Sequence, residues 1–146
     1  MRALTVLQPW AWAIAAGFKR VENRDWMPGR WIARGTRIAI HAGKRAPELA
    51  DLRFVERRVP AEAWRGSATQ RVAGAVVAVA KVANVVEAAK DLPEDQRPWF
   101  VGRFGWVLED VRRLAVPVAC RGQQRLWTLA GPELFAVLEQ LGEGRR

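Results

Sequence analysis

The chain has 146 residues, half of them apolar, which is enough for one domain with a sizeable core and argues against intrinsic disorder. Its 24 lysines and arginines outnumber its 15 aspartates and glutamates, for a formal net charge of +9. No apolar run reaches the roughly 20 residues that span a bilayer, and the N-terminus lacks the apolar stretch of a signal peptide, so we expect a cytoplasmic protein without a membrane partner.

In chain order, the first half predicts short strands and short helices in alternation. A helix opens at Pro9, which tolerates its missing N–H in a first turn, and Gly17 ends this helix as a C-cap. Pro47 and Pro60 open two further short helices. The strands expected in this half are Ala3–Leu7, Val21–Trp26 and Thr36–His41.

The second half contains the longest strand signal, Val72–Val86, which is apolar on both faces as in a central strand. Lys81 interrupts this strand. It is either buried with a partner, since an unpaired buried charge is costly, or it reaches outward along its methylene stem. The other elements expected here are a loop at Asp91–Pro98, strands at Phe104–Leu114 (bending through Pro117 into Cys120) and Leu126–Leu129, and a helix from Gly131 to Gly142.

Six or so strands interrupted by short helices predict an α+β fold built on a closed or nearly closed mixed β-barrel. We expect one domain over residues 1–146, with 143–146 as a frayed tail, and a monomer. A helix over residues 72–86 would contradict the barrel.

The positive charge has two interpretations. A polyanion such as RNA or DNA is the simplest partner for it, because each neutralised phosphate releases counterions. A basic surface also serves solubility, or reflects an arginine-rich genome. The eight tryptophans are equally ambiguous, because indole rings fill cores and also stack on bases.

The single cysteine, Cys120, and the single histidine, His41, limit the chemistry. One cysteine cannot form an intramolecular disulfide, and an ordinary structural zinc site needs about four N or S ligands. No loop has the spacing of calcium ligands. We therefore expect no metal and no cofactor. Nothing favours Cys120 as a nucleophile over a small buried residue.

Two groups of residues resemble the signatures of the ASCH domain family. The first group is Leu7-Gln8-Pro9-Trp10 followed by Gly17, Lys19, Val21, Glu22 and Arg24; the second is the 102–106 segment followed by Pro117, Gly122, Leu126 and Trp127. The resemblance runs from about Ala3 to Leu129. It departs at Arg125, where similar sequences usually carry glycine. It implies a PUA-like β-barrel with short peripheral helices, in a superfamily whose domains bind RNA, often in a cleft beside the barrel.

The resemblance also implies a rival function. Some small ASCH proteins are amidohydrolases that deacylate N4-acetylcytidine with a lysine, a threonine three residues later and a glutamate on a later strand. Lys19 matches the lysine, but Glu22 occupies the threonine position, and the 72–86 strand contains no glutamate. If the protein is an enzyme, Lys19 and Glu22 are the catalytic candidates, in an amidohydrolase of this kind or in a ribonuclease.

The same residues can be interpreted without the family. Lys19 follows a helix-ending glycine, where a cation is favoured by the helix dipole, or it is a buried base or nucleophile. Glu22 and Arg24 share a strand face, so they either pair with each other or present an acceptor and donors to a base edge. His41 and Lys44 end a strand, where residues often line a cleft, although a lone histidine is more often structural.

These observations lead to a hypothesis with two alternatives. We expect a nucleic-acid-binding module, for RNA before DNA, with a polar cleft for a base or nucleotide and an aromatic ring from residues 99–106 or Trp10 beside it. The alternatives are an enzyme on a modified nucleoside or on RNA, and a protein-interaction module. The expected ligand-binding residues are Lys19, Glu22, Arg24, His41, Lys44, Trp99, Arg103 and Trp106.

Overall fold

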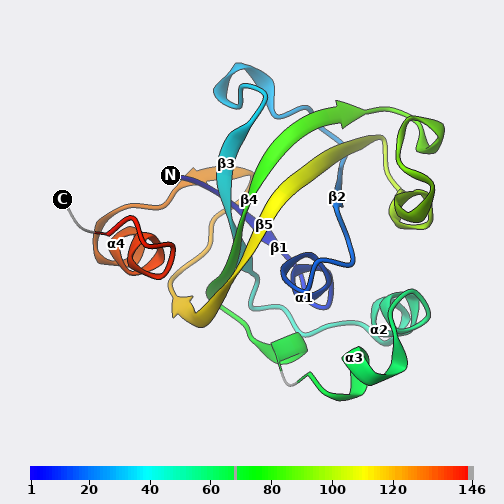
Figure 1. Cartoon of the computed structure of the whole chain (residues 1–146), viewed down its shortest axis with the longest axis horizontal. Helices are drawn as coiled ribbons and strands as arrows, with labels where there is room; N and C mark the ends of the chain where they lie inside the picture. Colours follow the sequence, from blue (N-terminus) through cyan, green and yellow to red (C-terminus); the bar gives the residue numbers. More distant parts are fainter. Residues whose placement is uncertain (68, 145–146) are drawn as a thin grey trace.

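The computed structural model describes residues 1–67 and 69–144, and this part of the chain contains a six-stranded sheet in the order β2-β5-β4-β3-β1-β6. β1 and β3 are parallel, and the other neighbours are antiparallel. The strands are β1 (Arg2–Val6), β2 (Val21–Arg24), β3 (Thr36–Ala42), β4 (Ala75–Val86), β5 (Phe104–Ala119) and β6 (Leu126–Thr128). The sheet curls into a half-barrel, with β4 and β5 curving side by side (Figure 1).

β4 confirms the long central strand expected over residues 72–86, although it begins at Ala75 rather than at Val72. Every residue from Ala75 to Ala80 is buried, as the apolar composition of both faces predicts. Three shifts in the β4–β5 register between Val76 and Asn84 bend the pair, which is how bulges curl a sheet. Lys81 lies at one of these shifts and reaches outward, where its ammonium pairs with Asp110 at 3.2 Å.

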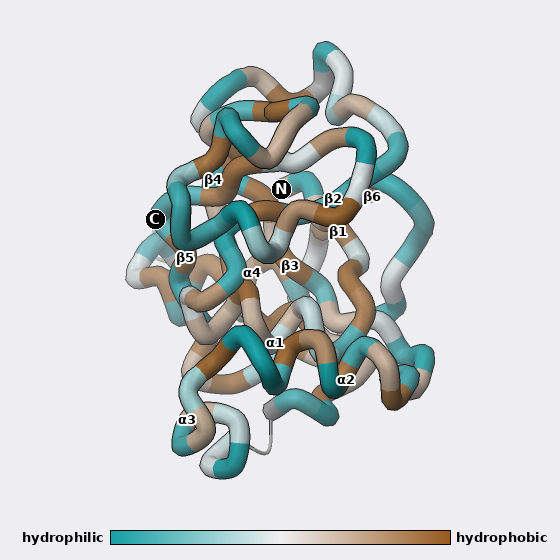
Figure 2. The backbone as a smooth tube through the Cα atoms, turned by 90° about the vertical axis from the view of Figure 1, so that its right-hand side faces the viewer, coloured by the Kyte–Doolittle hydropathy of each residue, from teal (hydrophilic) through white to brown (hydrophobic). Residues whose placement is uncertain are grey.

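Short helices surround the sheet, as expected. They are α1 (Trp10–Ala15), α2 (Leu49–Glu56), α3 (Ala61–Arg65) and α4 (Gly131–Gln140), with 3₁₀ turns at Gly29–Trp31, Thr69–Arg71, Ala89–Asp91 and Glu94–Trp99. α1 packs against β3, β4 and β5, whereas α4 packs against β5. Figure 2 shows the apolar colouring of β4, whose residues form the core together with the buried face of α1.

The sequence places some boundaries differently from the structure. β2 ends at Arg24 rather than at Trp26, because the chain turns into the 3₁₀ segment Gly29–Trp31, where Gly29 has a φ of +68°. The loop expected over residues 91–98 contains 3₁₀ turns. In the expected C-terminal tail, Glu143 accepts two hydrogen bonds from Arg37, and residues 145–146 lie outside the described part of the chain.

The end of α1 determines where Lys19 lies. Gly17 adopts a φ of +86°, a conformation that suits glycine after a helix. The chain then folds back sharply, so that the amides of Phe18 and Lys19 both donate to the carbonyl of Ala13. This turn brings Lys19 from a helix end into the interior, directly before β2.

Candidate functional site

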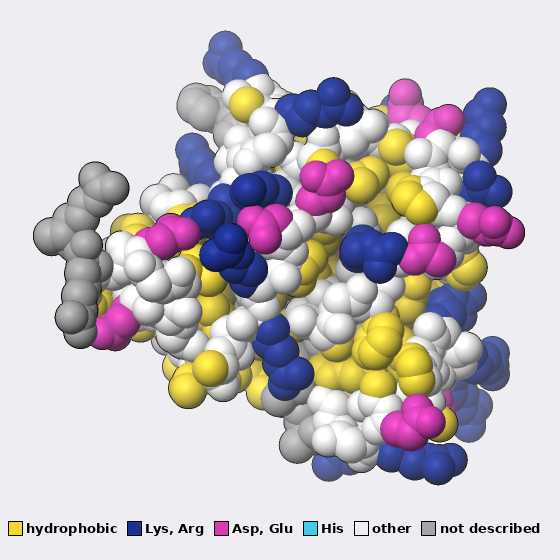
Figure 3. Space-filling model, in the orientation of Figure 1, with side chains coloured by type: hydrophobic (Ala, Val, Ile, Leu, Met, Phe, Trp, Pro, Cys, Tyr) yellow, Lys and Arg dark blue, Asp and Glu magenta, His cyan; other side chains and the backbone are white. Residues whose placement is uncertain are grey.

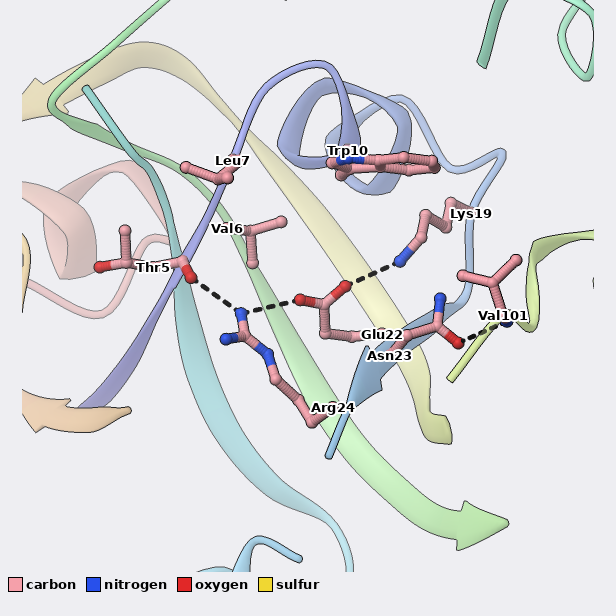
Figure 4. Close-up of a pocket in the computed structure, with 9 residues that line it drawn as sticks. All are labelled: Thr5, Val6, Leu7, Trp10, Lys19, Glu22, Asn23, Arg24 and Val101. Carbon is pink, nitrogen blue, oxygen red and sulfur yellow. Dashed lines mark hydrogen bonds and ion pairs between the residues drawn. The ribbon is translucent and has the colours of Figure 1, made fainter. Parts of the chain in front are cut away.

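A pocket of about 320 Å³ opens between β1, α1 and β2, at the unpaired gap of the curled sheet (Figure 4). The residues that line it come from β1 and the turn after it, from the start of α1, from the segment that includes β2, and from the loop before β5. They are Thr5, Val6, Leu7, Trp10, Lys19, Glu22, Asn23, Arg24 and Val101.

Three charged side chains form one ion array in this pocket: Lys19, Glu22 and Arg24. One carboxylate oxygen of Glu22 accepts a hydrogen bond from Lys19 Nζ at 2.8 Å, and the other accepts one from Arg24 Nη2 at 2.9 Å. Lys19 Nζ also donates to the carbonyl of Val21. The sequence correctly places these three residues together, because the reversal at Gly17 and the two-residue spacing on β2 bring them to one face.

The ion array is buried to different degrees. The side chains of Lys19 and Glu22 are 1% and 7% exposed, whereas that of Arg24 is 21% exposed and faces the pocket. Burial alone raises the pKa of Glu22, but the charges of Lys19 and Arg24 and their hydrogen bonds outweigh this effect and lower it below its ordinary value. Glu22 is therefore a carboxylate near neutral pH, able only to accept hydrogen bonds.

Arg24 also links two strands that do not pair with each other. Its Nη2 donates to the carbonyl of Thr5 on β1 at 2.8 Å, across the gap from β2. Its Nε is buried and has no hydrogen-bond partner among the described residues. The guanidinium thus both ties the half-barrel together and retains donor capacity that the protein does not use.

The aromatic wall of the pocket is Trp10. The sequence also allowed a ring from residues 99–106 at this position, and no ring from that segment lies there. Trp106 is fully buried in the core inside the sheet, and Trp99 is 3% exposed in the cluster around α1 and α2. Neither ring lines the pocket, because their elements turn these side chains inward. Lys19 Nζ lies 5.9 Å from the centroid of the Trp10 ring, which in turn packs against Phe54.

Asn23 is a lining residue that the sequence reasoning missed. Its side chain accepts a hydrogen bond from the Val101 amide at 3.0 Å and donates to the Trp99 carbonyl at 2.9 Å. These bonds fasten the 99–101 loop to β2 beside the ion array. Gly102 permits the close approach of the two segments, since a Cβ there would lie 3.1 Å from the Asn23 Cβ. The match between two segments 76 residues apart is not visible in sequence.

Arg103, Lys44 and His41 lie apart from this pocket. The Arg103 guanidinium lies 4.9 Å from the centroid of the Phe104 ring and does not line the pocket. Lys44 lines a different cavity, beyond the end of β3. His41 is 1% exposed and belongs to a second polar network. The structure therefore brings together three of the eight expected ligand-binding residues.

The histidine network consists of Thr5, His41, Cys120 and Trp127. Trp127 Nε1 donates to Thr5 Oγ1 at 3.1 Å, His41 Nδ1 lies 3.3 Å from the same hydroxyl, and His41 Nε2 lies 2.9 Å from the Cys120 carbonyl. A carbonyl only accepts, so Nε2 carries the proton, and the Thr5 hydroxyl donates to Nδ1. Burial lowers the pKa of His41, the Lys44 charge lowers it further, and the bond to Cys120 opposes them without reversing the shift. His41 is a neutral, internally bonded residue.

Charged residues outside the pocket are dispersed. Figure 3 shows Lys and Arg side chains across the viewed face with Asp and Glu between them. The net charge of +9 therefore does not by itself mark a binding surface on this face. Within the described residues, no group of three His, Cys, Asp or Glu side chains is close enough to hold a metal ion, and no helix is both long and apolar enough to cross a membrane.

The comparison with protein families decides the family. The model of the ASCH domain matches residues 4–118. The chain belongs to the ASCH domain family. Membership supports a nucleic-acid-related role at the level of the family and leaves the ligand open. No curated protein matched the sequence.

Solved ASCH structures have the same fold. The ASCH protein of Zymomonas mobilis is 17% identical, with a TM-score of 0.56 over 94% of this chain and 93% of that one. A serine-to-alanine variant of it has 17% identity and a TM-score of 0.55 over 94% of each chain. A tyrosine-to-phenylalanine variant has the same identity and TM-score over 94% and 96%. At this identity the likeness concerns the fold alone, and it confirms the expected PUA-like architecture.

Arg125 stands where the resemblance of the sequence to ASCH domains predicts a glycine. Its φ is +58°, in the left-handed region that glycine enters at no cost and arginine does not. The side chain compensates by a contact that glycine lacks, since its guanidinium lies 5.3 Å from the centroid of the Trp26 ring. Trp26 in turn packs edge-to-face on the buried Trp106.

Proposed function

We propose that this ASCH protein binds single-stranded RNA and holds one base in the pocket between β1, α1 and β2. The observation that carries the proposal is the ion array, a carboxylate between two cations that faces the pocket. The array has a net charge of +1 and lies in a chain of +9, which suits a ligand that carries phosphates.

The pocket offers complementary chemistry to a nucleobase. Glu22 is a carboxylate whose remaining lone pairs accept from an exocyclic amine, and Arg24 supplies donors for ring nitrogens or carbonyls. Trp10 forms one wall, on which a base can stack. Stacking of a base on an aromatic ring is worth about 1–3 kcal/mol, and it supplies affinity with little dependence on sequence.

The burial of the Lys19 and Glu22 charges, with Arg24 part-buried beside them, also supports a functional role. Moving charged groups out of water costs several kcal/mol per ion, and apolar residues of similar volume often replace such a group without loss of stability. An ion array of this kind therefore contributes little stability compared with apolar residues of similar volume. A site that recognises the edge of a base needs fixed donors and acceptors, and that need explains why the charges are kept.

Hydrolysis of an acylated nucleoside has less support. The lowered pKa of Glu22 makes it a weak base, whereas general bases work best near the operating pH. Lys19 Nζ already donates to two acceptors, Glu22 and the Val21 carbonyl. Among the described residues, the lining of the pocket includes no second carboxylate and nothing from β4, where the amidohydrolases place their glutamate.

Arg24→Ala tests the proposal through binding of a fluorescently labelled single-stranded RNA of mixed sequence. The variant should bind roughly tenfold or more weakly than the original protein, because a hydrogen bond to a charged group contributes about 1.5–3 kcal/mol. The variant also loses the link to Thr5, so its melting curve is needed to correct for the folded fraction.

Arg37→Ala is the matched control. Arg37 also pairs with a glutamate, Glu143, and it lines no part of the pocket. The control removes the same charge, so it should change RNA affinity only through the overall field of the protein. Equal affinities of the two variants, or no RNA binding by the original protein at low salt, would rule out the proposed function.

A further inference from the structure

A second cavity, of about 500 Å³, lies between the turn after β3, α2, α3 and the segment before β4. The function proposed above makes no use of it. Its lining combines basic, amide and apolar side chains with the backbone of a glycine. The lining residues include Gln8, Gly43, Lys44, Arg45, Trp64 and Arg71.

The second cavity is basic. Lys44, Arg45 and Arg71 line it, and among the described residues no aspartate or glutamate does. Arg45 pairs with Glu48 at 3.0 Å, but neither Lys44 nor Arg71 forms an ion pair in the described part of the chain. Two cations without counter-charges at one cavity favour an anionic ligand.

The backbone holds Lys44 in place at the cavity. A Cβ on Gly74 would lie 3.0 Å from the Cε and 3.3 Å from the Cγ of Lys44, so the lysine stem lies against the bare glycine backbone. The amide of Gly74 donates to the Ala42 carbonyl, which fixes that backbone to the end of β3. The contact limits the positions open to the lysine stem, which lowers the entropy cost of holding an anion there.

An aromatic wall stands beside these cations. Trp64 lines the cavity and is braced edge-to-face against Trp12, with ring centroids 5.5 Å apart. Gln70 donates to the Trp64 carbonyl at 2.5 Å, which ties α3 to the segment before β4. Cations beside an aromatic face are the combination that single-stranded nucleic acids bind, with contacts to phosphate and stacking of the base.

The two pockets share a wall that is one residue thick. Leu7 lines the first pocket, and the next residue, Gln8, lines the second. Across this wall, a Cβ on Gly43 would lie 3.1 Å from the Leu7 Cδ2. Consecutive residues of the chain therefore line the two pockets, which makes them neighbours on the protein.

We propose that the second cavity binds the phosphate and base of the nucleotide next to the one held by the ion array. The ligand is then a phosphodiester-linked strand rather than a free nucleoside. The inference rests on the proposed function, and it adds the number of nucleotides recognised and the residues that contact the backbone, Lys44 and Arg71.

The test is the double variant Lys44→Ala/Arg71→Ala, assayed with labelled single-stranded RNA of mixed sequence over a range of salt concentrations. Each phosphate contact on a single strand contributes about 0.7 to the slope of log affinity against log salt, or roughly fivefold in affinity at about 0.1 M salt. Because the two cations are assigned to one phosphate, the double variant should lose roughly fivefold in affinity at that salt concentration, and its slope should fall by about 0.7.

Lys81→Ala/Lys90→Ala is the control with the same loss of charge, because neither lysine lines either pocket. Thermal melts of both double variants confirm that they are folded. If the Lys44/Arg71 variant matches the control in affinity and slope while Arg24→Ala still weakens binding, the second subsite is wrong and the proposed function stands. If Arg24→Ala binds as the original protein does, the proposed function fails, and the assignment of the second cavity to a neighbouring nucleotide fails with it.

Discussion

Two buried polar networks meet at Thr5, and they are completed in different ways. In the histidine network, both ring nitrogens of His41 and the indole N–H of Trp127 have partners within the protein. In the ion array, by contrast, one buried hydrogen-bond donor has no partner within the described part of the protein. The Nε of Arg24 has no partner among the described residues, and its guanidinium faces a pocket.

The difference separates a structural network from a recognition site. Thr5 contributes its hydroxyl to the first network and its backbone carbonyl to the second, so one residue of β1 supports both. A network with every donor and acceptor paired has nothing left to offer a ligand, whereas one with spare donors and acceptors at a pocket does. Changes in the ion array should therefore alter stability and binding together, and changes in the histidine network should alter stability alone.

The largest effect is expected from Glu22→Ala. Removing the carboxylate leaves the buried Lys19 and the part-buried Arg24 without their counter-charge, and breaking a buried ion pair in this way typically costs about 3–5 kcal/mol. Urea denaturation measures the loss, with Glu143→Gln as the control in an exposed pair that should change little. Similar midpoints for the two variants would contradict the role of Glu22 as the centre of the array.

The triple variant Lys19→Met/Glu22→Leu/Arg24→Met separates the effect of the ion array on stability from its effect on RNA binding. Apolar side chains of similar volume remove the cost of burying charge, so most of the stability lost in Glu22→Ala should return. RNA binding should not return, because no donor or acceptor of the array remains. A triple variant that binds RNA as tightly as the original protein would show that the array is not the recognition site.

A smaller effect is expected from Gly122→Ala in the histidine network. A Cβ at this position would lie 2.5 Å from His41 Cε1 and 2.7 Å from Thr5 Oγ1, so the network would have to shift. Such overpacking typically costs about 1–3 kcal/mol. The folded fraction should bind RNA normally, since Gly122 lines neither pocket, and the exposed neighbour Gln123→Ala should change neither quantity. Weaker binding per folded molecule would erase the distinction between the two networks.

The sequence was sufficient to predict the ion array because its geometry is local. Gly17 and the alternation of side chains along β2 act within eight residues, so Lys19, Glu22 and Arg24 could be placed together before any fold was known. The long strand over residues 72–86 was predictable for a similar reason, since a β-branched run that is apolar on both faces is typical of a strand buried in the middle of a sheet.

The positions of the other predicted site residues depend on pairing between segments that are distant in the sequence. Trp106 lies opposite Glu22 in the β2–β5 register, but only the curl of the whole sheet determines that its ring is fully buried. His41 and Lys44 are three residues apart, yet β3 pairs with β1 and encloses the histidine beside Thr5, while the lysine leaves the strand for the second cavity. Neither outcome follows from spacing along the chain.

The smallest expected effect is a dependence of stability on pH that comes from the histidine network alone. Burial is the largest cause of the lowered pKa of His41, so the folded protein binds a proton at this ring less readily than the unfolded chain, whose pKa is near 6.5. Stability is then complete above the unfolded pKa and falls as the pH drops below it, toward the folded pKa. His41 is the chain's only histidine, so between about pH 7.5 and 5.5 its imidazole is the side chain expected to change charge.

The urea midpoint of the original protein should therefore be lower at pH 5.5 than at pH 7.5. The midpoint of His41→Gln should be the same at both pH values, and lower than that of the original protein at each. RNA affinity per folded molecule should stay constant over this range, because Glu22, with its lowered pKa, remains ionised. An equal decrease in His41→Gln would assign the dependence to another group, and a parallel decrease in RNA affinity would mean that the two networks are coupled through Thr5.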